Sequence, residues 1–523
     1  MTYRTIKNIF AASLLVLSLS ATAQEIPTGW MHKNPDDAVY GMSTEQAYQF
    51  LRGKTSQTVI VGILDSGVET DHPDLKANIW VNPHETPGNN IDDDKNGYID
   101  DINGWDFLGG KNGEDVWHDT YEIARLYKYY GEKFKGTTEA SVAAADKKAY
   151  NEYKTIKAKF EEEKAETDKE FAFYDQLYSS IEKVIKDIGK DDITAEDLAS
   201  YDPTDKDLMT GKLILQSVMA KGVNAKDVMG ELKDAYNYYE SKAKYGMNPD
   251  YDPRPVIGDN YTDASERYYG NAEVEGPDAL HGTHVAGMVG AVRGNNEGMD
   301  GIADNVRIMA VRVVPDGDER DKDVANAIRY AVDNGAKVIN MSFGKGYVFN
   351  KQTVDDAVKH AMSKDVLLVH GAGNDAINVD KKTVYPNDQL ADGTTVTNWL
   401  NVGASDIAGN TAPFSNYGKK NVDVFAPGVA IYSTLTDHGY KYLDGTSMAS
   451  PAAAGVAALI RSYYPSLTAE QVKKIIIKSV YKPKHKVALP GSEGKNVKMK
   501  KISVSGGIVN AYKAVQLAEK MSK

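Results

Sequence analysis

The stretch TVIVGILD at residues 58–65 decides the fold of this 523-residue chain. Residues 58–64 form a continuous apolar run rich in β-branched side chains, which is typical of a strand buried on both faces. From about Gly276 onward, strand-like and helix-like segments alternate. This alternation is typical of a parallel sheet with crossover helices. The sequence therefore predicts an α/β fold in which the strand at 58–64 joins the later sheet.

Six later segments define this sheet and its helices. Strands are predicted at residues 306–314, 337–341 and 366–370, and helices at 322–334, 354–363 and 447–463.

The middle of the chain has a different composition, with much Lys, Glu, Ala and Tyr and little Gly or Pro over residues 114–251. Helical spacing predicts one long polar helix or a helical pair at 144–186, with a break near Gly189, and another helix at 223–244. We interpret residues 114–275 as a mainly helical insertion that divides one α/β domain into 24–113 and 276–523. A solvated hairpin or small bundle is the simpler reading, and a coiled-coil face for a partner is the alternative.

The first residues have the features of an export signal. Arg4 and Lys7 precede an apolar stretch at 9–19, and Ala-Thr-Ala ends at residue 23. This pattern predicts a signal peptide at 1–23 and an exported protein, periplasmic or secreted. No later segment approaches the ~20 apolar residues of a membrane span. The chain has no cysteine, and its net charge of −13 argues against nucleic-acid binding. No oligomeric state is predicted.

Three short segments carry a carboxylate, an imidazole and a hydroxyl. They are Asp65-Ser66-Gly67, the HGTHVAG block that begins at His281, and the GTSMASP block that contains Ser447. Each residue alone has an ordinary explanation as a turn, loop or helix-cap residue. Together they supply the parts needed for nucleophilic acyl transfer.

These segments, with His72-Pro73-Asp74-Leu75, resemble the signature blocks of the subtilisin-like serine proteases. The resemblance implies a three-layer α/β fold and an endopeptidase acting on proteins or peptides. It implies that Ser447 is the nucleophile, His281 the general base and acid, and Asp65 the residue that orients His281. It gives His284 a structural role. A zinc site at His281 and His284 is the competing interpretation, but no HExxH pattern accompanies them.

The same resemblance extends to the substrate cleft. Gly371-Ala372-Gly373-Asn374 resembles the oxyanion block, so Asn374 is expected to donate its side-chain amide beside the Ser447 backbone N–H. A turn cap is the alternative for Asn374. Residues Ser342, Phe343 and Gly344, which we call the edge segment, resemble the strand edge that pairs with the substrate main chain.

Two calcium sites are predicted. Residues 92–101, DDDKNGYIDD, nearly repeat a calcium-binding loop, although no glutamate occupies the twelfth position, where Asn103 stands. A charged turn without metal is the alternative, but so many adjacent carboxylates repel one another without a counterion. A second site rests on the resemblance alone and uses Asp74 together with the Asn295-Asn296 loop, with Asn296 as the expected ligand. The predicted ligands of the loop are Asp92, Asp94, Asn96, the Tyr98 carbonyl, Asp100 and Asp101.

Alternative functions were weighed against a protease. A binding-only relative of the same fold would be free to lose the triad and oxyanion residues, which are complete here. An α/β-hydrolase esterase is disfavoured because Ser447 lacks the G-x-S-x-G elbow. The insertion, placed just before the His281 block, is expected to be a lid or docking surface at the active-site rim. Residues 24–57 are too few for a folded propeptide of domain size.

Overall fold

A computed structural model describes residues 26–35, 39–190 and 192–523. The signal peptide predicted at 1–23 lies outside these residues. Within the described part, no helix has both the length and the apolar character needed to cross a membrane.

The central sheet contains seven strands, and every neighbouring pair in it is parallel. Its order is β2-β3-β1-β4-β5-β6-β7. The predicted α/β fold class is therefore confirmed. The strand predicted at residues 58–64 is β1, which lies near the centre of the sheet. Its apolar side chains pack against a helix layer on each face of the sheet. The bounds are β1 Val59–Asp65, β2 Gly104–Asp106, β3 Val306–Arg312, β4 Val338–Met341, β5 Leu367–Gly371, β6 Trp399–Ser405 and β7 Val424–Pro427.

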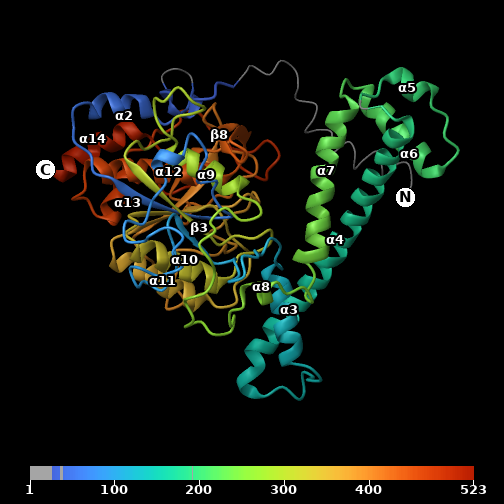
Figure 1. Ribbon diagram of the computed structural model, residues 1–523, viewed down its shortest axis with the longest axis horizontal. Helices are drawn as coiled ribbons and strands as arrows, with labels where there is room; N and C mark the ends of the chain where they lie inside the picture. Colours follow the sequence, from blue (N-terminus) through green and yellow to red (C-terminus); the bar gives the residue numbers. More distant parts are fainter. Residues whose placement is uncertain (1–25, 36–38, 191) are drawn as a thin grey trace.

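Helices cover both faces of the sheet and complete three layers (Figure 1). On one face, the alanine-rich α12 lies so close to its neighbours that a side chain at Gly455 would meet Ile302 at 2.5 Å. That face carries α2 (Thr44–Leu51), α9 (Leu280–Gly290), α12 (Thr446–Tyr463), α13 (Ala469–Lys478) and α14 (Ala511–Ser522). The other face carries α10 (Asp321–Asp333) and α11 (Lys351–Ser363).

The elements predicted from periodicity are present within a few residues of their expected bounds. Strands β2, β6 and β7 were not predicted; β2 has three residues and lies in a turn-rich segment. Outside the main sheet lie two small antiparallel pairs, β8 (Ile431–Leu435) with β9 (Gly439–Leu443), and β10 (Val487–Ala488) with β11 (Asn496–Val497).

The predicted insertion contains most of the remaining helices. We call α4 to α7 the arm, because they project together from the body (Figure 1). The long helix α4 ends where Gly189 adopts a left-handed conformation, with φ of 69°, as the predicted break requires. The bounds are α3 Glu122–Lys133, α4 Lys147–Ile188, α5 Ala195–Ser200, α6 Lys206–Met219, α7 Ala225–Ser241, a π-helical turn Lys242–Gly246, and α8 Arg254–Ile257.

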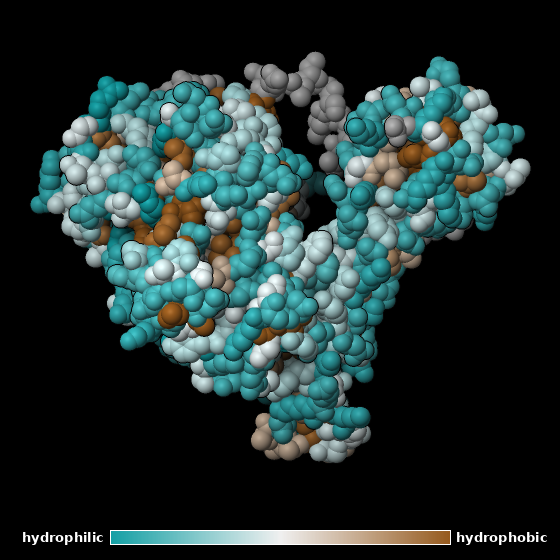
Figure 2. Space-filling view, viewed as in Figure 1, coloured by the Kyte–Doolittle hydropathy of each residue, from teal (hydrophilic) through white to brown (hydrophobic). Residues whose placement is uncertain are grey.

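Two small cores hold the insertion together. The outer one lies between α4, α5, α6 and α7, and includes Ile181 and Leu215. The inner one packs α3 and the start of α4 against Tyr347 and Phe349 of the body. The outer part of the arm stands clear of the body, with open space between them (Figure 2). The arm is therefore rooted at the body and free at its tip.

The two ends of the region 114–275 pack into the body. Val116, Ile257 and Tyr269 are buried in the core beneath the sheet, beside α10. These residues lie outside the helical part that projects.

Candidate active site

Asp65 and His281 are brought together by the ends of two core elements. Asp65 is the last residue of β1 and is 1% exposed, while His281 is the second residue of α9. His281 Nδ1 lies 2.5 Å from Asp65 Oδ1. The following Gly282 allows this approach, since a Cβ there would stand 2.0 Å from the Gly67 carbonyl oxygen.

The charge of Asp65 sets the protonation of His281. Burial by itself lowers the pKa of the imidazole. The negative charge of Asp65 and the hydrogen bond to it outweigh burial, so the pKa of His281 is raised above 6.5, and the charge of Asp278 acts in the same direction. The Asp65 carboxylate thus favours a proton on His281, as required of a residue that stabilises an imidazolium.

Ser447 stands in the first turn of α12 and faces the edge segment. Its Oγ donates a hydrogen bond to the Ser342 carbonyl at 3.2 Å. Ser447 and His281 line two different cavities, and both cavities are also lined by Ser342 and Phe343. If Ser447 is to pass its proton to His281, its hydroxyl must first leave the Ser342 carbonyl. Hydrogen bonds between catalytic groups commonly form or shorten only when substrate is bound.

Asn374 has an amide whose orientation is fixed by its neighbour. Its Oδ1 accepts hydrogen bonds from the Thr446 backbone N–H at 2.9 Å and from Thr446 Oγ1 at 3.0 Å. Because a backbone N–H can only donate, the oxygen must face Thr446, and the amide nitrogen remains available as a donor. Asn374 and Ser447 line the same cavity, of about 470 Å³.

The edge segment is anchored to α12 through its first side chain. Ser342 Oγ donates to the Ser447 carbonyl at 3.0 Å and lies 2.9 Å from Ser450 Oγ. The Ser342 side chain is therefore occupied within the protein, and the segment is left to act through its backbone and through Phe343.

Lys345, directly after the edge segment, is a site residue that sequence reasoning missed. Its buried Nζ lies 2.6 Å from Glu122 Oε2 and 2.8 Å from Asp321 Oδ1. Burial alone would raise the pKa of Glu122, but the charges of Arg125 and Lys345 outweigh it and lower that pKa to about 2. Only a three-dimensional fold brings residues 122, 321 and 345 together, so no local signal pointed to them.

His284 occupies a structural position. Its Nε2 is 3.1 Å from the Ile431 carbonyl oxygen and 3.0 Å from that of Lys441, which makes it a donor to the β8–β9 hairpin. Burial lowers its pKa to about 4. Among the described residues, neither His281 nor His284 belongs to a group of three possible metal ligands, which disfavours the competing zinc interpretation.

Part of the predicted calcium loop forms a compact group of carboxylates. Glu85, Asp92 and Asp94 offer oxygens that all lie within 4.8 Å of one another. Three such oxygens fit the preference of calcium for carboxylate ligands. Glu85 was not predicted, because it precedes the motif by seven residues.

These carboxylates and the other predicted ligands of the loop all make hydrogen bonds within the protein, and Asp92 accepts from the Asn96 and Gly97 backbones at 3.0 and 2.9 Å. The Asn96 side chain donates to Asp94 Oδ2 at 3.2 Å and to Asp101 Oδ2 at 3.1 Å. Asp101 is buried and also accepts from Tyr330 Oη at 2.7 Å. Asp100 accepts from the backbone of Asn90 at 2.8 Å. Tyr98 packs its ring in the core beneath the sheet.

At the second predicted calcium site, Asp74 contacts the neighbour of the expected residue. Its Oδ1 accepts from Asn295 Nδ2 at 2.7 Å, and its Oδ2 accepts from the Met299 backbone at 3.1 Å. Asn296 adopts a left-handed conformation, with φ of 63°, in the same loop. Asp74 is fully buried, and that burial raises its pKa.

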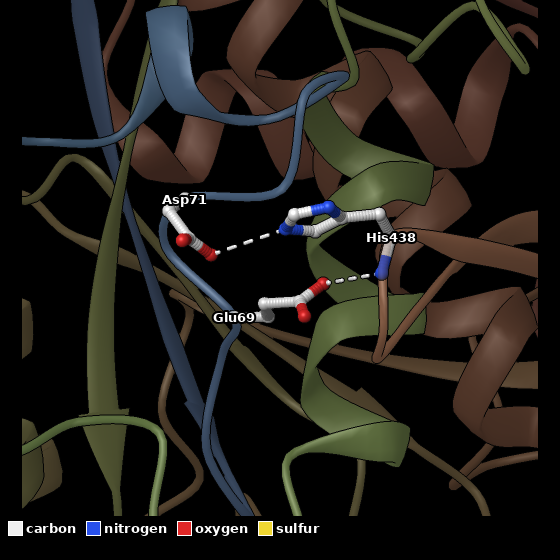
Figure 3. A group of neighbouring side chains, drawn as sticks. All are labelled: Glu69, Asp71 and His438. Atoms are coloured by element: carbon white, nitrogen blue, oxygen red, sulfur yellow. Dashed lines mark hydrogen bonds and ion pairs between the residues drawn. The ribbon is translucent and has the colours of Figure 1, made fainter.

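A third group of possible metal ligands, Glu69, Asp71 and His438, was not predicted (Figure 3). The Glu69 carboxylate accepts hydrogen bonds from the backbones of Asp437, at 2.9 Å, and His438, at 3.2 Å. His438 Nε2 lies 3.6 Å from Asp71 Oδ1. These contacts clamp the β8–β9 turn to the segment after β1, which accounts for the group without a metal.

Comparison with known proteins gives consistent matches. The model of the Subtilase family matches residues 56–502. The chain is 45% identical to the thermophilic serine proteinase of Bacillus sp. (strain AK1), over 35% of this chain and 42% of that protein. It is 41% identical to subtilisin DY of Bacillus licheniformis, over 37% of this chain and 67% of that protein. It is 38% identical to thermitase of Thermoactinomyces vulgaris, over 45% of this chain and 75% of that protein. The chain thus spans less than half of the first relative.

Proposed function

Because this chain belongs to the subtilase family, we propose that it is a serine endopeptidase that hydrolyses peptide bonds of proteins and peptides. The observation that carries the proposal is the 2.5 Å contact between His281 and Asp65, which ends β1. The cavity beside this pair and the cavity beside Ser447 share Ser342 and Phe343. Catalytic groups of open parallel sheets stand at the carboxyl ends of the strands.

In the proposed mechanism, Ser447 Oγ attacks the scissile carbonyl carbon while its proton passes to His281 Nε2. Asp65 holds Nδ1 and stabilises the imidazolium. His281 then gives that proton to the leaving amine as the C–N bond breaks, which leaves an acyl ester on Ser447. A water molecule, deprotonated by His281, hydrolyses the ester and returns the serine.

The developing oxyanion would be stabilised by two donors. They are the Asn374 side-chain amide, whose oxygen is held by Thr446, and the backbone N–H of Ser447. The edge segment Ser342, Phe343 and Gly344 would pair with the substrate main chain, which suits flexible or unfolded protein segments.

We further propose that calcium stabilises the protein. Glu85, Asp92 and Asp94 would hold one ion, with the other predicted ligands of residues 92–101 around it. Asp74 with Asn295 or Asn296 would hold a second. The bound ion would screen the mutual repulsion of these carboxylates. We also propose export through a signal peptide at 1–23, a catalytic domain of 24–113 and 276–523, and a helical insertion at 114–275.

Casein cleavage tests the proposal. The purified protein is compared with Ser447→Ala, and both are treated with a fluorophosphonate that labels activated serines. We expect the unmodified protein to cleave casein and to be labelled by the probe, and Ser447→Ala to do neither. If the unmodified protein neither cleaves casein nor reacts with the probe, the chain is a binding scaffold with a subtilase fold, and the peptidase assignment is wrong.

A further inference from the structure

A cavity of about 400 Å³ beside His281 has walls from both the body and the arm. From the body come Asp65 and His281 and, in addition, Ser342 and Phe343. The arm supplies Asn237, Tyr238 and Ser241, all from the last turns of α7. A segment of the insertion, outside the catalytic blocks in sequence, therefore forms part of the cleft beside His281.

The wall formed by the arm is held in place by Asp316. Its Oδ2 accepts a hydrogen bond from Ser241 Oγ at 2.5 Å and lies 2.9 Å from His118 Nδ1. The His118 ring stacks on Tyr245 of the insertion, with ring centres 4.0 Å apart, and on Trp117, at 4.8 Å. These contacts fix the position of the wall before substrate arrives, which reduces the ordering cost of binding.

The charge of the cavity is negative where it meets solvent. Asp278 and Asp316 are exposed lining residues. Across the described residues, Asp278 forms no ion pair with a lysine, arginine or histidine. The lining cation Arg312 is buried, and its charge is already matched by Asp106 Oδ2 at 2.8 Å. A cationic ligand group would therefore find the Asp278 carboxylate without competing with a resident ion pair, whereas Asp316 is shared with His118 and Ser241.

Aromatic side chains supply the remaining surface of the cavity. Trp117 is 49% exposed and Tyr238 is 56% exposed, while Phe343 is partly buried. Aromatic faces next to carboxylates attract a flat guanidinium group through stacking and charge together. The carboxylates would repel an acidic side chain of the substrate. An apolar side chain would displace water from the carboxylates without offering them a hydrogen bond or a charge.

We propose that this cavity binds an arginine side chain of the substrate, and that Tyr238 and Asp278 determine this specificity. The inference rests on the proposed peptidase function. Since Phe343 also belongs to the edge segment, the arginine would lie within a few residues of the scissile bond. Lysine would bind more weakly, because its ammonium group cannot stack on a ring as a planar guanidinium does.

The test uses pairs of fluorogenic peptides that differ by a single arginine or citrulline, its uncharged isostere, placed in turn at the three positions on each side of the scissile bond. At one position, kcat/KM is expected to favour arginine about 10-fold, from an ion pair and a stacked ring together. In Asp278→Asn and in Tyr238→Ala the ratio falls toward one. The control variants are Asp356→Asn and Tyr129→Ala, which change an exposed aspartate and an exposed tyrosine outside the cavity. Both should keep the full ratio of kcat/KM between the arginine and citrulline peptides.

The ratio is taken within each variant, so an effect of Asp278 on His281 cancels. A ratio near one at every position, or one that neither cavity substitution changes, overturns the inference. Binding of the same peptides to Ser447→Ala, followed by fluorescence anisotropy, separates it from the proposed function. Tighter binding of arginine peptides supports the site even if the unmodified protein cleaves nothing, and equal binding of both peptides contradicts it.

Discussion

Glu122, the first residue of α3, and Lys345, directly after the edge segment, form a buried ion pair with 2.6 Å between Oε2 and Nζ. One residue belongs to the helical insertion and the other to the expected substrate edge. The insertion and the cleft are therefore joined at a point where neither charge can be solvated by water.

Replacing Lys345 by Met is expected to destabilise the protein by about 3–5 kcal/mol, because the buried Asp321 loses its ion-pair partner while Glu122 keeps only Arg125. KM for extended peptides should also rise, since the edge segment loses its anchor. Urea unfolding and peptide kinetics measure the two effects. The double variant Asp321→Asn/Lys345→Met should recover part of the loss, because it removes the carboxylate that is left without a cation.

Lys359→Met serves as the control for this ion pair. Lys359 pairs with Asp392 at the surface, where both side chains are largely in water, so little change in stability is expected. Equal destabilisation by Lys345→Met and Lys359→Met would show that the buried pair has no special role.

The raised pKa of His281 predicts the pH dependence of activity. His281 must be neutral to accept the proton of Ser447, so kcat/KM should fall as pH drops through a value above 6.5. The negative charge of Asp278 helps to raise this pKa, and Asp278→Asn should move the acid limb to lower pH. The pH profile of kcat/KM checks both statements, with Asp356→Asn as the control. An acid limb that stays in place in Asp278→Asn contradicts the second.

Much of this site could be predicted because its chemistry is carried by short local patterns. Asp65, His281 and Ser447 each lie in a segment whose neighbours predict the proposed role, and β1 is marked by seven consecutive apolar or small residues. Glu85, Lys345 and Tyr238 could not be predicted in the same way. Lys345 and Tyr238 would gain their proposed roles from contacts across the fold, which nothing in the adjacent sequence encodes. Glu85 lies seven residues before the motif that its carboxylate joins. The exposed Tyr238 reads as an ordinary surface residue of a polar helix until α7 is placed beside the cleft.

Three buried histidines predict acid sensitivity of the fold. Burial lowers the pKa of His32, His284 and His370 to about 4. Between pH 6.5 and about 4 the unfolded chain therefore binds more protons than the folded one, so stability is full above pH 6.5 and falls with acid. Each histidine contributes a slope of up to about 1.4 kcal/mol per pH unit. Urea unfolding of Ser447→Ala at pH 7.5 and 5.0 measures the loss, and His32→Gln should reduce it. An unchanged difference between the two pH values would contradict the role of His32.

Asn374→Ala is expected to lower kcat roughly 10²- to 10³-fold with little change in KM, a magnitude that comes from subtilisin itself. The reason is that the amide nitrogen acts on charge that develops only in the transition state. Thr446→Val removes one of the two hydrogen bonds to Asn374 Oδ1 and leaves the backbone one, so a much smaller loss is expected. Steady-state kinetics on one peptide measure both. A loss that appears in KM alone would place Asn374 in substrate binding.

Removal of calcium should lower the melting temperature. At calcium concentrations about 100 times the Kd, one ion that binds only the folded state adds about 2.7 kcal/mol, or roughly 2–4 °C for a chain of this size. Calorimetry of Ser447→Ala with calcium and with EGTA measures the shift, and the inactive variant avoids self-digestion. Asp94→Asn and Glu85→Gln should shrink it, because they remove charge from the carboxylate group at residues 85–94. Asp71→Asn, in the clamp of Figure 3, is the matched acidic control and should keep the full shift. If EGTA lowers the melting temperature equally in all four proteins, the ion is bound elsewhere, and Asp74→Asn then tests the second site.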